Sequence, residues 1–199
     1  MTSPMPQYNL VGTGDPRSTV DSFDGMRVRA TGGLGEAFKA VGGVPTSVPS
    51  NEAYNAMEAN VVDTVAFAQH AHLSFRTIDQ GTWWTANLNP GTVNCPIVVN
   101  IDAYEDLSDE HREALDSSVD ESIAHYLDNY QNNVLTQWDQ ILEEKNVTKV
   151  EFSAEELQKF RDATKGIADQ WIQEKSAQGI PAQELYDMVV NKLNEMHGS

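Results

Sequence analysis

The chain has 199 residues and carries 30 Asp and Glu against 13 Lys and Arg, which gives a net charge of −17 and an isoelectric point near 4.4. This length suffices for one domain, or for two small lobes, with a core of its own. A nucleic-acid backbone and an anionic membrane surface would both repel so acidic a protein, so we expect neither as a partner. Because Cys95 is the only cysteine, a disulfide within the chain and a cysteine-rich metal site are excluded.

No apolar run approaches the roughly 20 residues that a membrane-spanning helix needs. The first residues also lack the basic start and the apolar stretch of a signal peptide. Most of the acidic residues follow residue 101. The first half is therefore nearly neutral, apolar and rich in turns, whereas the second half has the composition of strongly solvated helices.

The first hundred residues alternate short strand patterns with short helix patterns. The strands are expected at 8–12, 26–30, 44–48 and 61–67, and the helices at 34–41 and 51–59. Two successive strand–helix–strand units at this spacing predict a parallel sheet with right-handed crossovers. Further strands are expected at 82–87 and 93–100, and Pro96 places the second at a sheet edge, at a bend or at a crossing between lobes.

Beyond Ser108 the apolar residues recur every three or four positions, which predicts one helix to about residue 145. Such a helix is roughly 57 Å long at 1.5 Å per residue, and one small lobe cannot cover it. After a short strand over 147–152, Ser153 and Glu156 have the spacing of a capping box that opens a further helix. Pro181 begins a last amphipathic helix. The fold class is therefore α/β, a lobe with a parallel-rich sheet followed by long C-terminal helices.

Three local motifs could carry chemistry. The turn Gly32-Gly33-x-Gly35 precedes a helix and offers free amides to an anion, but it matches neither common nucleotide-binding pattern, and a tight turn is the plainer interpretation. His70-x-His72 lacks further ligands at a recognised metal spacing, which favours a hydrogen-bonded pair. In Trp83-Trp84 one indole lies on each strand face, and we expect Trp84 to face a cleft.

Several strings resemble, in the same order, the TRAP-transporter solute-binding proteins of the DctP type. That family reads roughly L-K-G-x-K-[IM]-R-V, A-L-G-A-x-P, E-x-Y-x-A-L-Q and V-[VI]-D. The corresponding strings here are Phe23-Asp24-Gly25-Met26-Arg27-Val28, Ala40-Val41-Gly42-Gly43-Val44-Pro45, Asn51-Glu52-Ala53-Tyr54-Asn55-Ala56-Met57 and Val61-Val62-Asp63. The resemblance continues through Val98-Val99-Asn100 and the acidic start of the long helix, and it covers about residues 8–178.

This resemblance implies a lobe of the periplasmic-binding-protein type II kind and a non-enzymatic, periplasmic subunit without a cofactor. Such a subunit captures a small organic carboxylate and delivers it to a membrane permease. In the family, the arginine of the K-[IM]-R-V string forms the salt bridge to the carboxylate, and we assign this role to Arg27 rather than Arg29. The other residues expected to contact the ligand are Phe67, Gly32, Gly33, Asn87, Asn89 and Trp84.

The chain departs from the family in its ligand-contacting string. After Asp63 some relatives have a glutamate that helps bind a cation, but Ala66 stands there in this chain, so no metal is expected. Phe67 takes the contacting position, which suits a more apolar or aromatic ligand. The alternative function is a small α/β enzyme or regulatory domain that binds an anion at the Gly32–Gly35 helix start.

The resemblance also predicts how the chain is organised. Residues 1–22 would form a hinge-region strand and loop, 23–92 the substrate-binding lobe two, 93–152 a crossover strand, long inter-lobe helix and short strand, and 153–199 the C-terminal helices. Because family members are longer, the chain resembles their C-terminal part without the signal peptide and the first part of lobe one. We therefore expect the apolar face around Tyr126, Leu127, Tyr130 and Val134 to lack cover and to favour self-association.

Overall fold

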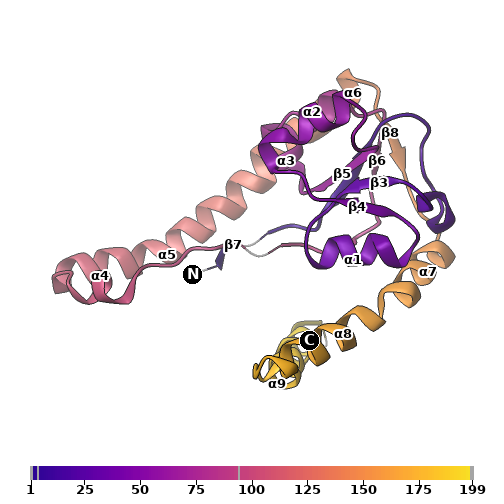
Figure 1. Cartoon of the computed structure of the whole chain (residues 1–199). Helices are drawn as coiled ribbons and strands as arrows, with labels where there is room; N and C mark the ends of the chain where they lie inside the picture. The colour runs from indigo at the N-terminus through magenta and orange to yellow at the C-terminus, as the bar shows by residue number, and fades with distance from the viewer. Residues whose placement is uncertain (1, 4, 94, 198–199) are drawn as a thin grey trace.

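The main sheet of the computed structural model has six short strands in the order β4-β3-β5-β2-β6-β8 (Figure 1). The structure describes residues 2, 3, 5–93 and 95–197. The strands are β2 (Asn9–Gly12), β3 (Arg27–Arg29), β4 (Val44–Thr46), β5 (Thr64–Phe67), β6 (Trp83–Thr85) and β8 (Thr148–Val150). Strand β3 is parallel to β4 and β5, and β6 is parallel to β8, which confirms the parallel-rich α/β fold.

Strand β2 departs from the predicted parallel arrangement. It lies between β5 and β6 and is antiparallel to both, with Asn9 opposite Phe67 and Val11 opposite Trp84. All four residues of β2 are buried, so both of its faces belong to the core. The division of the chain at residues 22, 92 and 152 stays a prediction, although β2 and β8 join the strands of residues 23–92 in one sheet.

Helices cover both faces of this sheet (Figure 1). On one side lie α2 (Ala53–Glu58), α3 (Gln69–Ser74) and α6 (Leu135–Glu144), and on the other α1 (Gly33–Ala40) and α7 (Ala154–Thr164). Successive side chains of a strand point to opposite faces of the sheet, and directly paired residues point to the same face. Each face of the sheet therefore packs its own set of side chains against the helices on that side. Trp84 packs edge-on against Trp138 of α6, with ring centroids 5.4 Å apart. On the α1 side, Phe23 lies 5.7 Å from Phe38 and from Phe152.

The long helix predicted from Ser108 is present and is interrupted by one π-helical turn. It comprises α5 (Asp109–Asn129), the π turn η4 (Tyr130–Val134) and α6. The Ser108 hydroxyl accepts a hydrogen bond from the His111 amide and so caps the helix start. All residues of α5 are described and none is buried, and the helix extends from the body with α4 (Ile101–Glu105) at its far end (Figure 1).

The strand predicted over 93–100 is much shorter in the structure. Only Cys95–Pro96 (β7) forms a strand, and it pairs with β1 (Thr2–Ser3) outside the main sheet. Asn94 lies outside the described residues. Because Pro96 has no amide hydrogen to donate, this segment suits a two-residue edge pairing rather than a central strand.

In the part of the chain that the structure describes after β8, three helices stand where two were predicted. Helix α7 ends at Thr164, and after Lys165 the chain continues as α8 (Gly166–Ala177), which precedes α9 (Ala182–His197). Ser153 caps α7 as predicted, but the Glu156 carboxylate accepts a hydrogen bond from the Val20 amide instead of closing the capping box. None of the helices that the structure describes combines the length and the apolarity needed to cross a membrane.

Self-association stays a prediction, but part of the surface expected to drive it is covered. The ring of Tyr130 packs against His70 of α3, and Tyr126 packs against Tyr130. Leu127 remains 51% exposed. A larger apolar surface lies on α9, where the exposed side chains are Leu185, Met188, Val189, Leu193 and Met196.

A glycine at the end of β2 lets the indole of Trp83 reach the backbone. A Cβ atom at Gly12 would lie 2.1 Å from Cζ2 of Trp83, which is fully buried and cannot move aside. Gly12→Ala is therefore expected to lower the free energy of unfolding by about 3 kcal/mol, as overpacking does. Urea titration checks this, with Gly33→Ala as the control because nothing lies within 4 Å of its added Cβ. Equal losses in both variants would contradict the prediction.

Candidate functional site

The carboxyl ends of β3, β5 and β6 meet at one edge of the sheet. The start of β2 lies at the same edge, since β2 is antiparallel to β5 and β6. In open α/β sheets ligands bind outside the carboxyl ends of the strands. We call this region, defined by Tyr8, Arg29 and Phe67, the carboxyl edge.

Arg29 ends β3 and is held by the segment that follows β4. Its Nε donates to the Val48 carbonyl oxygen and its Nη2 to the Ser50 hydroxyl, both at 3.0 Å. The guanidinium carbon lies 4.4 Å from the centroid of the Phe67 ring, a cation–π contact. The fold thus holds two of the guanidinium nitrogens and places the guanidinium over the Phe67 ring.

The charge of Arg29 has no carboxylate partner in the part of the chain that the structure describes. The residue is only 7% exposed, and burial lowers the pKa of its guanidinium. A guanidinium stays protonated in proteins, so this is a buried cation. A buried charge is costly unless an opposite charge or strong hydrogen bonds compensate for it. The site is therefore suited to an anion.

Aromatic side chains form the wall beneath this cation. Phe67 meets Tyr8 edge-on at 6.5 Å and Phe75 at 5.5 Å. Burial raises the pKa of the Tyr8 phenol, with a further contribution from Cys95, while Arg29 acts in the opposite direction. The backbone amide of Tyr8 donates to the Gly91 carbonyl oxygen at 3.0 Å, which ties the start of β2 to the loop after β6.

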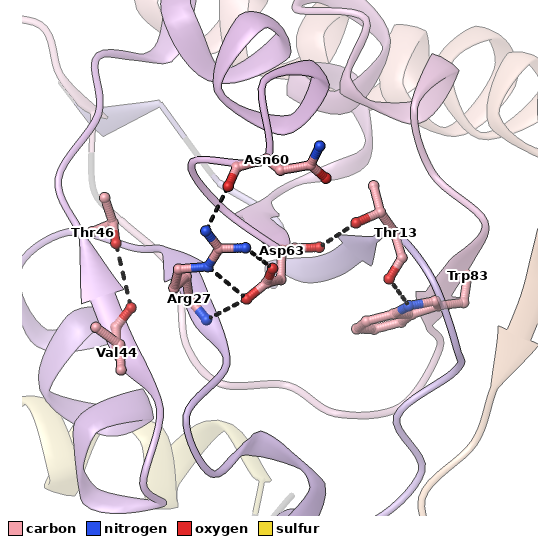
Figure 2. Close-up of polar contacts among 7 residues, drawn as sticks. All are labelled: Thr13, Arg27, Val44, Thr46, Asn60, Asp63 and Trp83. Atoms are coloured by element: carbon pink, nitrogen blue, oxygen red, sulfur yellow. Dashed lines mark hydrogen bonds and ion pairs between the residues drawn. The ribbon is translucent and has the colours of Figure 1, made fainter.

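Arg27, the predicted anchor, lies at the opposite end of β3 (Figure 2). Its Nε donates to Asp63 Oδ2 at 3.1 Å, its Nη2 pairs with Asp63 Oδ1, and its Nη1 donates to the Asn60 carbonyl oxygen. The pair lowers the pKa of Asp63, chiefly through the hydrogen bond from Arg27, and raises that of Arg27. Asp63 also accepts the Arg27 amide at 2.8 Å. These bonds occupy the guanidinium with partners inside the fold.

The geometry therefore favours Arg29 over Arg27 as the residue that receives a ligand. The two are separated by one residue, so they share a strand face, and only their position along the strand distinguishes them. The family string can be aligned with this sequence in two ways. The dipeptide Arg27-Val28 matches the R-V of the family string, whereas counting from Gly25 in G-x-K-[IM]-R reaches Arg29. The count from the glycine is the sequence signal that points to Arg29.

Two other predicted residues lie at the carboxyl edge. Gly32 and Gly33 follow β3 and line a hollow of about 400 Å³ together with the segment 90–93. Gly32 has φ of 56°, a left-handed conformation that favours glycine, and it precedes the first turn of α1. Among the described residues that line this hollow, none is charged. An anion at this helix start would therefore meet no charged side chain in the lining of the hollow.

The remaining predicted residues make contacts within the fold. The Asn87 side chain donates to the Phe152 carbonyl oxygen and accepts the Phe152 amide, which ties the segment after β6 to that after β8. Asn89 is exposed beside Leu157 and Arg161. Trp84 packs on Trp138 under α6. Their roles as ligand contacts stay predictions.

The two histidines do not act together as a metal pair. His72 is fully buried, with Nδ1 2.7 Å from the Thr77 hydroxyl and Nε2 3.3 Å from the Asn9 carbonyl oxygen. Burial lowers its pKa to about 3, so the ring is neutral. His70 instead faces Tyr130. Within the described ranges, no three His, Cys, Asp or Glu side chains come together as metal ligands would.

Comparison with known proteins gives a consistent family. Residues 9–175 match the family described as bacterial extracellular solute-binding protein, family 7 (DctP). The chain is also similar to the ectoine-binding periplasmic protein TeaA of Halomonas elongata. The two are 24% identical over 191 residues, which cover 92% of this chain and 53% of that protein.

Solved structures share the fold. A TRAP solute-binding protein of an unidentified microbe from a marine metagenome, specific for aromatic acid ligands, has a TM-score of 0.79 and 18% identity over 91% of this chain and 58% of its own. A TRAP periplasmic solute-binding protein of Desulfovibrio salexigens with bound orotic acid has a TM-score of 0.81 and 17% identity over 94% of this chain and 60% of its own. The chain thus spans only about half the length of the curated relative.

Proposed function

We propose that this chain, which belongs to the DctP family of bacterial extracellular solute-binding proteins, holds a small organic carboxylate at Arg29. The observation that carries the proposal is the buried guanidinium of Arg29, which has no carboxylate partner among the described residues. A carboxylate ligand would supply the missing opposite charge. The pair would be strong because the site is partly shielded from water and the guanidinium is already oriented.

The surroundings of Arg29 favour a ligand with an apolar or aromatic body. The Phe67 ring lies under the guanidinium and Tyr8 stands edge-on beside Phe67, so the surroundings of the cation are aromatic and uncharged. Two proteins of similar structure bind ring-bearing carboxylates, aromatic acids in one and orotic acid in the other. Malonate, bound by another TRAP protein of this fold, has no ring, so the family itself does not decide this point.

Family membership further supports a role in import rather than catalysis. The matched family consists of extracellular solute-binding proteins, and the curated relative is named as periplasmic. We infer for this chain a periplasmic location, no enzymatic activity, and delivery of the bound acid to the membrane permease of a TRAP transporter. The most direct test of these inferences is binding without turnover.

The test compares an acid with its uncharged amide. Benzoate is expected to bind this chain with an affinity weaker than micromolar, since the chain spans only about half the length of the curated relative, and benzamide is expected not to bind. Isothermal titration calorimetry measures both, and chromatography of the mixture shows whether benzoate is recovered unchanged. Equal binding of benzamide, or no binding of benzoate, would contradict a carboxylate site at Arg29.

A further inference from the structure

The segment between β4 and α2 holds the guanidinium of Arg29 through two uncharged acceptors. The Ser50 hydroxyl accepts from Nη2 and the Val48 carbonyl oxygen accepts from Nε, both at 3.0 Å. Among the described residues, these two groups make the hydrogen bonds of the guanidinium. Because neither acceptor is charged, they orient the cation without neutralising it.

The two bonds use one particular edge of the guanidinium. This group has five N–H donors in one plane, and its edges form forks that match the two oxygens of a carboxylate. We call the pair Nε and Nη2 the side fork, and the pair Nη1 and Nη2 the end fork. Val48 and Ser50 occupy both nitrogens of the side fork. Both donors of Nη1 and one donor of Nη2 are left by the described residues, so a carboxylate at the end fork would break neither bond.

Arg27 uses its side fork differently (Figure 2). Its Nε donates to Asp63 Oδ2 at 3.1 Å and its Nη2 donates to Asp63 Oδ1, so one carboxylate of the fold fills the side fork. Its Nη1 donates to the Asn60 carbonyl oxygen. All three nitrogens of Arg27 are thus bound within the fold, whereas in Arg29 two neutral acceptors replace the carboxylate and Nη1 is left.

One face of the Arg29 guanidinium is closed to an approaching anion. The Phe67 ring lies against that face, with the guanidinium carbon 4.4 Å from the ring centroid. Arg29 as a whole is 7% exposed. Together with the occupied side fork, this leaves an anion few ways to meet the cation, and the end fork keeps the free donors.

The segment that carries Ser50 is itself fixed at both ends. Before it, β4 pairs with β3, the strand that carries Arg29. Pro49 separates the two acceptors, and its ring holds φ at −53°. Ser50 then begins the 3-10 turn η2 (Ser50–Glu52), which leads into α2, where Ala53 is fully buried. The acceptors are therefore in place before any ligand arrives.

We propose that Ser50 is a positioning residue of the carboxylate site, because it occupies the side fork of Arg29 and leaves the end fork to the carboxylate of the ligand. This inference rests on the proposed function and adds to it the residue that sets the binding geometry. Without the Ser50 hydroxyl, the guanidinium has to be oriented when the ligand binds, and that ordering weakens the affinity.

Calorimetric titration of three variants with benzoate tests the role of the hydroxyl. Ser50→Ala is expected to bind benzoate about tenfold more weakly than wild type, the effect of one hydrogen bond that orients a charged group. Ser50→Thr keeps a hydroxyl and is expected to bind within about twofold of wild type. Ser47→Ala is the matched control, since Ser47 is an exposed serine of the same segment, and it should leave the affinity unchanged. Melting temperatures show that each variant is folded.

NMR of the arginine side chains shows which donors the acid meets. When benzoate is added to wild type, the Nη protons of Arg29 are expected to shift more than its Nε proton, whose bond to Val48 persists. The signals of Arg29 are identified by their loss in Arg29→Met. This titration uses the wild-type protein, so it decides the geometry even where Ser50→Ala is unstable.

The outcomes separate this inference from the proposed function. If wild type binds benzoate and Ser50→Ala binds it equally well, Ser50 does not position Arg29, and the carboxylate site stands. A folded Ser50→Thr that binds as weakly as Ser50→Ala would also overturn the role of the hydroxyl. If the Nε proton shifts most, the acid binds at the side fork and the geometry is wrong. If wild type does not bind benzoate, the proposed function and this inference are both overturned.

Discussion

Replacing Arg29 by methionine is expected to lower the affinity for benzoate about 100-fold or more. The guanidinium is the buried cation of the carboxyl edge, and losing a charged hydrogen bond to a ligand costs about 2–5 kcal/mol. Methionine keeps an apolar stem over the Phe67 ring, so the fold should survive. Titration calorimetry of the variant, with its melting temperature as the measure of folding, gives the result.

The matched control is Arg27→Met, two residues earlier on the same strand face. Because Arg27 is bound by Asp63 and by the Asn60 carbonyl oxygen, its loss should leave benzoate affinity within about twofold. It should lower the free energy of unfolding only slightly, since both partners of the ion pair are about a third or more exposed and water screens them. If Arg27→Met abolishes binding while Arg29→Met does not, Arg27 is the residue that binds the carboxylate, as the family resemblance implies.

Acidification is expected to destabilise the fold through His72. The ring is fully buried and neutral, and burial lowers its pKa from 6.5 to about 3. Between these values the unfolded chain binds a proton that the folded chain does not, so stability is complete above about pH 6.5 and falls as the pH approaches 3. At about 1.4 kcal/mol for each pKa unit, the whole interval corresponds to roughly 5 kcal/mol.

Asp and Glu side chains titrate in part of the same pH range, so the loss of stability in the wild type has several sources. Comparison with the variant His72→Gln isolates the contribution of His72. Urea unfolding of both proteins at about pH 7 and about pH 4.5 gives two differences in stability. The variant is expected to be less stable at the higher pH, since it loses the ring contacts with Phe67 and Trp138, and to approach the wild type at the lower pH. A constant difference at both values would show that His72 takes up a proton at the same pH in the folded and unfolded states.

Local patterns in the sequence predicted most of the individual elements. The apolar spacing beyond Ser108 predicted the long helix, and Ser153 caps its helix as expected. These signals are local, because a helix face and its cap involve residues only three or four positions apart. The ordered strings of the first half likewise indicated the solute-binding family that residues 9–175 match.

Tertiary structure alone decided which strands pair and which arginine is available to a ligand. Strand β2 pairs with strands more than fifty residues away, and β8 pairs with β6, which is also more than fifty residues away. No local period encodes such pairings. Arg27 and Arg29 have the same residue type and strand face, and they differ because Asp63 pairs with Arg27 while no carboxylate among the described residues pairs with Arg29. The sequence by itself thus determined the elements and the family, and the long-range contacts determined where the free charge lies.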